Sequence, residues 1–197
     1  VLLNRQFAEN IDYVTLDNFS AGYKGIKHFW KMGHDRIGII NGDLKASNAQ
    51  AILHGSRQAL SDHQIDPEPG LCKDGRYSRD QVQELTKEFM ALDNPPSAIF
   101  AHDDDMALAA REVLLKMGLR IPEDVALMGI DDIEMGALTG VELSTISQKK
   151  YEMGSIGVKT VIKRIEERTA QMVEKVMLKA EVVIRKSCGF FQTGYKR

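Results

Sequence analysis

The chain has 197 residues, 43% of them hydrophobic, which is enough apolar material for one or two small domains with a core. Lysine and arginine total 26 against 28 aspartate and glutamate, so the formal net charge at pH 7 is −2. This balance excludes a strongly basic surface for nonspecific nucleic-acid binding, and any DNA contact must come from elsewhere. No run of about 18 apolar residues predicts a membrane span.

The first residues and the two cysteines bear on location. Residues 1–5 (VLLNR) lack the charged region and cleavage site of a signal peptide, and they are typical instead of the end of a buried strand. We therefore expect a soluble module whose upstream sequence is missing. Cys72 and Cys188 match no paired metal-ligand spacing, which favours reduced thiols in a cytoplasmic protein.

In the first half of the chain, short apolar runs alternate with longer helical patterns. A strand at 13–16 is followed by Asp17, Asn18 and Ser20 as possible caps, and then by a helix that ends at Gly33. After this helix, which spans 21–32, the predicted elements are a strand at 36–41, a helix at 49–63, a short strand at 71–73 and a helix at 78–91. Such alternation is typical of βαβ units, so we predict an α/β fold with parallel sheets and helices on both faces.

The second half repeats the alternation. Pro95-Pro96 precedes a strand at 98–101, and three aspartates then begin a helix that ends near Gly118. The remaining predicted elements are a strand at 125–130, a helix at 151–169, a polar stretch, a strand at 180–185 and a tail at 190–197 without periodicity.

Carboxylates gather where two of these strands end. Asp103 to Asp105 follow the strand at 98–101, and Asp131 ends the next one. In open parallel sheets, ligands bind beyond the carboxyl ends of the strands, and ionised carboxylates accept hydrogen bonds from the hydroxyls of a polyol. We predict that Asp103 and Asp131 contact a ligand, whereas Asp104 and Asp105 cap a helix or face solvent.

The same carboxylates could instead bind a divalent cation or accept a phosphoryl group. No phosphate-binding loop, dinucleotide-binding loop, zinc-protease motif or nucleophile elbow accompanies them, and the five histidines show no clustered ligand spacing. His102 could touch a ligand or simply line the strand end. We therefore expect no metal site, no cofactor and no catalytic activity.

Several segments resemble the LacI/GalR family of bacterial transcription regulators. The segment PPSAIFAHDDDMAL at 95–108 is similar to that family's P-x-A-I-F-A-x-N-D-x-M-A-L stretch, and GLRIPEDV at 118–125 followed by MGIDD at 128–132 looks like its G-L-R-V-P-E-D-V and V-G-F-D-D segments. Weaker similarities are LSTISQ at 143–148, VVIRKS at 182–187, LDN at 16–18 and GHDRI at 33–37. The resemblance covers nearly the whole chain.

The resemblance implies a type I periplasmic-binding-protein-like fold, in which two α/β lobes joined by three crossover strands close on an effector, here with the N-terminal lobe incomplete. It divides the chain into 1–16 as a remnant of the N-terminal lobe and crossover, 17–145 as the C-terminal effector-binding lobe, 146–184 as crossover, N-lobe helix and return strand, and 185–197 as the C-terminal tail. Effector binding then biases the spacing of two DNA-reading heads in a dimer.

Residue by residue, the resemblance assigns five effector-binding side chains: Asn4, Tyr77, Asp103, Asp131 and Gln148. Tyr77 would stack on a sugar ring, although a core tyrosine is the plain alternative. The family's ligand-binding arginine aligns with Ile52, with Arg57 nearby, and the lost bidentate donor puts a standard hexose, phosphate or carboxylate effector in doubt.

The resemblance also implies partners. A homodimer would use Ala109, Glu112, Val113, Lys116 and Met135, with an exposed solvent face as the alternative. Operator DNA would be reached only through an N-terminal helix-turn-helix that this sequence lacks. We predict a cytoplasmic, sugar-responsive transcription regulator, acting as a repressor, with a periplasmic sugar-binding protein of a transport system as the alternative. The sequence identifies neither the effector nor the operator.

Overall fold

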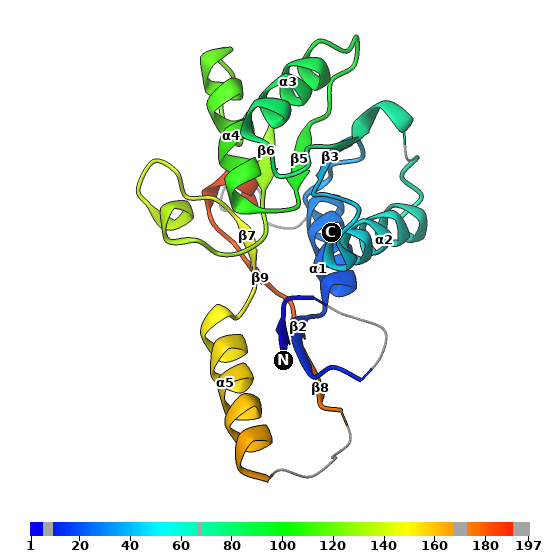
Figure 1. Cartoon of the computed structure of the whole chain (residues 1–197). Helices are drawn as coiled ribbons and strands as arrows, with labels where there is room; N and C mark the ends of the chain where they lie inside the picture. Colours follow the sequence, from blue (N-terminus) through cyan, green and yellow to red (C-terminus); the bar gives the residue numbers. More distant parts are fainter. Residues whose placement is uncertain (6–9, 67, 168–172, 191–197) are drawn as a thin grey trace.

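Two lobes, each built on its own parallel sheet, make up the computed structural model, which describes residues 1–5, 10–66, 68–167 and 173–190. The larger lobe contains helices α1 to α4, and the smaller one contains α5 (Figure 1). A two-stranded antiparallel ribbon, β7 (Thr145–Ser147) with β9 (Glu181–Val183), lies between the lobes. Together with the link from β2 into α1, the two strands of this ribbon give three connections between the lobes.

The sheet of the larger lobe has the strand order β4-β3-β5-β6, and all neighbouring strands are parallel. Its strands are β3 (Ile37–Asn41), β4 (Cys72–Asp74), β5 (Ala98–Ala101) and β6 (Ala126–Met128). Its helices are α1 (Asn18–Met32), α2 (Ser47–Asp62), α3 (Arg79–Met90) and α4 (Asp104–Lys116). Short 3₁₀ turns occur at Pro69–Leu71, Glu134–Ala137 and Lys186–Cys188.

Both faces of this sheet are buried. Successive side chains of a strand point to opposite faces, so Phe100 of β5 packs with the α1 and α2 core, while Ile99 packs with the α3 and α4 core. A strand buried on both faces has a continuous apolar sequence, and this is why the runs at β3 and β5 were predictable.

Helices α1 and α2 cross at two glycines. An added Cβ on Gly22 would lie 2.0 Å from the carbonyl oxygen of Ile52, and one on Gly55 would lie 1.9 Å from that of Phe19. The backbones therefore approach more closely than any side chain would allow. This contact fixes α2, whose N-terminal turns line the candidate site.

The smaller lobe has a parallel sheet of order β1-β2-β8, formed by β1 (Leu2–Leu3), β2 (Tyr13–Leu16) and β8 (Lys175–Leu178). Helix α5 (Lys150–Glu167) packs against it through Met153, Gly157 and Thr160. The other side of α5 is apolar and exposed, with Ile165 retaining 69% of its accessible surface.

Three expectations from the sequence need correction. Strand β8 forms where a polar stretch was predicted. It was missed because it lies at the edge of its sheet, where Lys175 and Met177 are exposed and give no apolar run. Residues 1–3 do not end a buried strand, since Leu3 is 48% exposed. The predicted strands at 125–130 and 180–185 are shorter than expected. The predicted end of α5 at Thr169 and the tail beyond Phe190 fall outside the described residues.

Candidate ligand-binding site

A cavity of about 340 Å³ lies at the carboxyl ends of the larger sheet, facing the N-terminal segment. All five side chains predicted to bind an effector line it: Asn4, Tyr77, Asp103, Asp131 and Gln148. Leu3, Arg5, Ala46, Asn48, Ile52 and His102 complete the lining. Three other surface cavities have similar volumes, about 310, 320 and 370 Å³, but none of them contains a pair of half-buried aspartates.

Three of the predicted side chains stand on left-handed backbone. The φ angles are 55° at Asn4, 58° at Tyr77 and 129° at Asp131, a region that residues other than glycine seldom adopt. Such conformations cost about 1 to 3 kcal/mol each, and in proteins they cluster where ligands are held. Their convergence on one cavity supports a binding site.

Tyr77 leans across Gly42. A Cβ added to Gly42 would lie 2.2 Å from the Tyr77 hydroxyl oxygen, so only glycine permits the ring to lie there. Desolvation, and then the nearby charges of Asp103 and Asp131, raise the pKa of Tyr77 to about 12. The phenol therefore stays protonated and can donate a hydrogen bond at neutral pH.

Asp103 has two roles at the end of β5. Its Oδ1 accepts from the backbone N–H of Met106 at 2.6 Å and so caps α4, while the side chain also lines the cavity. Burial raises the pKa of Asp103 to about 6. Asp104, expected to cap or face solvent, is instead fully buried, whereas Asp105 is exposed as expected.

Asp131 begins a chain of side-chain hydrogen bonds. Its Oδ1 accepts from Gln148 Nε2, and Gln148 Oε1 in turn accepts from Asn4 Nδ2 at 3.1 Å. Burial, followed by the charge of Asp103, raises the pKa of Asp131 to about 7. The smaller lobe, which carries Asn4, is thereby tied to the strand end of the larger one.

His102 lines the same cavity and has only 3% of its surface exposed. Its Nδ1 accepts from the backbone N–H of Gly42 at 3.4 Å, so the ring proton belongs on Nε2, which has no hydrogen-bond partner among the described residues. Burial lowers the pKa of His102 to about 3, and the ring is therefore neutral.

Two residues of the cavity lining, Ile52 and Arg5, need separate comment. Ile52 lines the cavity at the position where the resemblance places an arginine. Arg5, which no sequence argument singled out, lines it as well and is exposed. Its position next to Asn4 was the available signal. Arg57 lines a different cavity, on the other side of α2.

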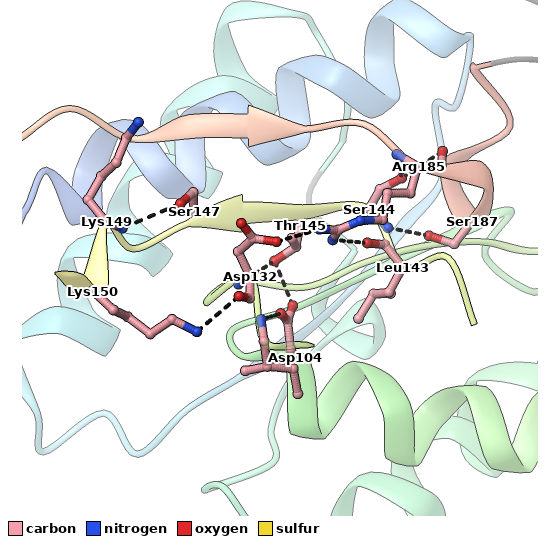
Figure 2. Close-up of polar contacts among 11 residues, drawn as sticks. Asp104, Asp132, Leu143, Ser144, Thr145, Ser147, Lys149, Lys150, Arg185 and Ser187 are labelled. Atoms are coloured by element: carbon pink, nitrogen blue, oxygen red, sulfur yellow. Dashed lines mark hydrogen bonds and ion pairs between the residues drawn. The ribbon is translucent and has the colours of Figure 1, made fainter. Parts of the chain in front are cut away.

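Next to the cavity, a polar network joins the larger lobe to the ribbon (Figure 2). Asp104 Oδ1 accepts from Thr145 Oγ1 at 2.6 Å, and Asp104 Oδ2 accepts from the backbone N–H of Ile133 at 3.0 Å. Arg185 pairs with Asp132 at 2.6 Å and also donates to the carbonyl oxygen of Leu143 at 2.8 Å. Thus Asp103 and Asp131 line the cavity, and the residue after each of them binds the ribbon region.

The predicted dimer residues are not all on the surface. Ala109 lies in the core shared by α3 and α4 and is 0% exposed, and Val113 is buried with 4% exposed, so this part of the prediction is wrong. Glu112 accepts from Arg79, Gln83 and Lys116 of the same chain. Lys116 and Met135 are exposed.

Two negative findings hold for the described ranges. Within them, no three His, Cys, Asp or Glu side chains gather as a metal site would require. Of the helices that the structure describes, none combines the length and apolarity needed to cross a membrane.

The profile of the periplasmic binding protein-like domain matches residues 26–188. The ribose operon repressor of Haemophilus influenzae is 32% identical over 188 residues, covering 95% of this chain and 56% of that protein. The repressor PurR of the same species is 31% identical over 180 residues, covering 90% of this chain and 54% of that protein. The chain thus spans about half the length of these relatives.

Solved structures agree with this assignment. A complex of the transcriptional regulator CelR with cellobiose superposes with a TM-score of 0.86 at 26% identity, covering 94% of this chain and 57% of that one. A LacI family regulator from Enterococcus faecium with bound ribose gives a TM-score of 0.84 at 28% identity, covering 94% and 68%. The chain therefore belongs to the periplasmic-binding-protein-like family, as an effector-binding domain of the LacI type.

Proposed function

We propose that this chain is the effector-sensing part of a sugar-responsive bacterial transcription regulator, acting as a repressor. The observation that carries the proposal is the cavity, which gathers Asn4, Tyr77, Asp103, Asp131 and Gln148 from both lobes. A ligand that contacts both lobes changes their preferred orientation, because it binds one arrangement better than the other. No catalytic activity is assigned.

The relatives support this interpretation over a transport receptor. The curated relatives described above are repressors, and the two structural neighbours are regulators with a sugar bound. For this chain we propose a neutral or aminated sugar as effector, operator DNA bound through a separate helix-turn-helix, and a cytoplasmic location.

The division of the chain into 1–16, 17–145, 146–184 and 185–197 remains part of the proposal, as does the homodimer. With Ala109 and Val113 excluded, we place the dimer contact on the exposed side of α4 and the neighbouring turn. Leu115 at the end of α4, and Met135 and Leu138 in the turn, are exposed and would supply the apolar content that an interface core needs.

The first test is the coding sequence in frame upstream of Val1. A helix-turn-helix followed by alternating strands and helices is the expected result. A cleavable export signal there would instead support the periplasmic transport receptor.

The second test measures binding by the 197-residue chain with ribose and cellobiose as first probes. A ligand present at 100 times its Kd should raise the free energy of unfolding by about 2.7 kcal/mol. Asp131→Ala should abolish this effect, while the matched control Asp105→Ala, on the exposed side of α4, should keep it. Equal responses of the two variants would contradict the site.

A further inference from the structure

Three buried polar atoms of the lining have no partner among the described residues: two are acceptors, and the third, His102 Nε2, is a donor. Among the described residues, Asn4 Oδ1 and Asn48 Oδ1 are buried and have no hydrogen-bond partner. Asp103 and Asp131 add two carboxylates, neither of which forms an ion pair within the described part of the chain. A carboxylate has about four acceptor sites, more than either uses here.

The orientation of the two amides follows from Asp131. Gln148 turns its NH₂ group toward Asp131 and donates to Oδ1, the arrangement that the ionised form of this carboxylate requires because it can only accept. Gln148 then presents Oε1 to Asn4, whose NH₂ donates to it. The partnerless atom of Asn4 is therefore its side-chain carbonyl oxygen. Asp131 thus orients both amides, so that the chain of hydrogen bonds ends in an acceptor at Asn4.

Cations are few around these acceptors. Arg5 is the one cationic side chain in the cavity lining that the structure describes, and it is exposed to solvent. The charge of Lys150, which is not among the lining residues, lowers the pKa of Asp131, and its Nζ donates to the carbonyl oxygen of Asp132. Ile52, which lines the same cavity, adds an apolar surface and no charge.

Together these features select against an anionic ligand. A phosphate or carboxylate would face Asp103 and Asp131, and like charges brought together in a partly desolvated site repel each other strongly. A neutral sugar satisfies some of the acceptors with its hydroxyls, but it leaves both carboxylates without a counter-charge, and burying such charges is costly.

We propose that the effector is a polyhydroxylated compound bearing a protonated amine, an amino sugar in its simplest form, with the ammonium group bound by Asp103 and Asp131. Its hydroxyls donate to Asn4 and Asn48, and its C–H face packs on Tyr77 and Ile52. The inference rests on the proposed function, because it names the ligand class of the same cavity.

The test uses sets of probes that share a carbon skeleton and differ in charge. Glucosamine, glucose and glucuronate form one set, and galactosamine, galactose and galacturonate form a second. Calorimetry at pH 7 with the 197-residue chain should give, in the set that binds, a Kd for the amine roughly tenfold below that of the neutral sugar. The acid should not bind measurably.

Variants locate the charge preference. Asp103→Asn and Asp131→Asn should each reduce the amine-to-neutral ratio to about threefold or less, while Asp105→Asn should keep it. Ile52→Arg should weaken the amine and allow the acid to bind, because it adds the missing counter-charge.

Each outcome bears on a separate claim. If a neutral sugar binds as tightly as its amine, or more tightly, the amine assignment is overturned and the sugar-sensing function stands. If no member of either set binds but ribose or cellobiose does, the amine assignment fails and the sugar-sensing function stands; if none of these probes binds, both fail. If the amine is preferred but the preference survives both carboxylate variants, the proposed location of the ammonium is wrong.

Discussion

The two lobes differ in how completely they bury their apolar surface. The sheet of the larger lobe has helices on both faces, and Phe29, Phe89 and Phe100 of its core are fully buried. The sheet of the smaller lobe packs against one helix, and Val158, Ile162 and Ile165 of that helix remain exposed. Burial of apolar area is the main stabilising term in folding, so the larger lobe should carry most of the chain's stability.

The two lobes also contribute differently to the cavity. The larger lobe supplies a rigid floor for the cavity through strand ends and capped helices, while the smaller lobe supplies Asn4 through a two-residue strand. A site shared between a rigid and a weakly stabilised part responds to ligand by ordering or reorienting the weaker part.

The largest effect is expected from Gly55→Ala, which attacks the larger lobe at the crossing of α1 and α2. The new Cβ would lie 1.9 Å from the carbonyl oxygen of Phe19, so the helices must separate. We expect a loss of about 3 kcal/mol in the free energy of unfolding, measured by urea denaturation.

Gly154→Ala in α5 is the matched control. Nothing lies within 4 Å of the place that the new Cβ would take, and alanine favours a helix over glycine by up to about 1 kcal/mol. This variant should be unchanged or more stable. Equal losses for the two alanine variants would show that the two lobes are equally tightly packed.

The second prediction concerns the border between the lobes. Asp104→Ala removes the acceptor of both the Thr145 hydroxyl, which is buried, and the backbone N–H of Ile133, which is partly buried. We expect a loss of about 2 to 3 kcal/mol in thermal or urea unfolding. Asp105→Ala removes an exposed carboxylate from the same helical turn and should stay within about 0.5 kcal/mol of the parent chain.

The third prediction is a gain in stability. Burial raises the pKa of Asp131 to about 7 from its ordinary value of 3.8, with Asp103, Asp104, Lys150 and Gln148 around it. Ionising it in the folded state is costly, so the parent chain should lose stability as the pH rises from about 4 to 7. At pH 8, Asp131→Asn should be more stable by about 1 to 2 kcal/mol, since partial exposure reduces the cost.

The check is the unfolding midpoint of both proteins between pH 4 and 8. Their difference should be small near pH 4 and full above pH 7. A difference that is constant with pH would mean that Asp131 is already ionised throughout this range.

The smallest effect is expected in the smaller lobe. Ile165→Lys replaces an exposed apolar side chain of α5 and should change the free energy of unfolding by no more than about 0.5 kcal/mol. It should also weaken any self-association through this face, which sedimentation velocity measures. A loss of 2 kcal/mol or more would show that the face is covered within the chain.

How far the sequence predicts this structure depends on burial. Ala98–Ala101 is apolar throughout, and Ile37–Asn41 is apolar up to its last residue, because both sheet faces are covered; both strands were predicted nearly to the residue. β8 alternates between exposed and buried side chains at a sheet edge, and its pattern does not stand out from a loop.

The residues of the candidate site were also predicted only in part from the sequence. Strand ends predicted Asp103 and Asp131 from topology, whereas Tyr77, Asn4 and Gln148 came from the resemblance. Asn48 reaches the cavity through tertiary packing that leaves no local pattern, and the only signal for Arg5 was its position next to Asn4. Ala109 and Val113 were misassigned because a helix pattern does not reveal which face a second helix covers, and α3 covers this one.

Asp103 and Asp131 line the cavity, and the residue that follows each of them, Asp104 or Asp132, binds the ribbon region through its side chain. A single peptide bond therefore joins each cavity residue to a residue that contacts the ribbon. Consecutive Cα atoms are about 3.8 Å apart and joined by a rigid plane. A shift of Asp131 toward a bound molecule therefore moves Asp132 and the end of Arg185 with it. Under the proposed function, ligand occupancy would be transmitted to the lobe boundary through the main chain itself, so substitutions in the surrounding core should change the strength of this coupling without abolishing it.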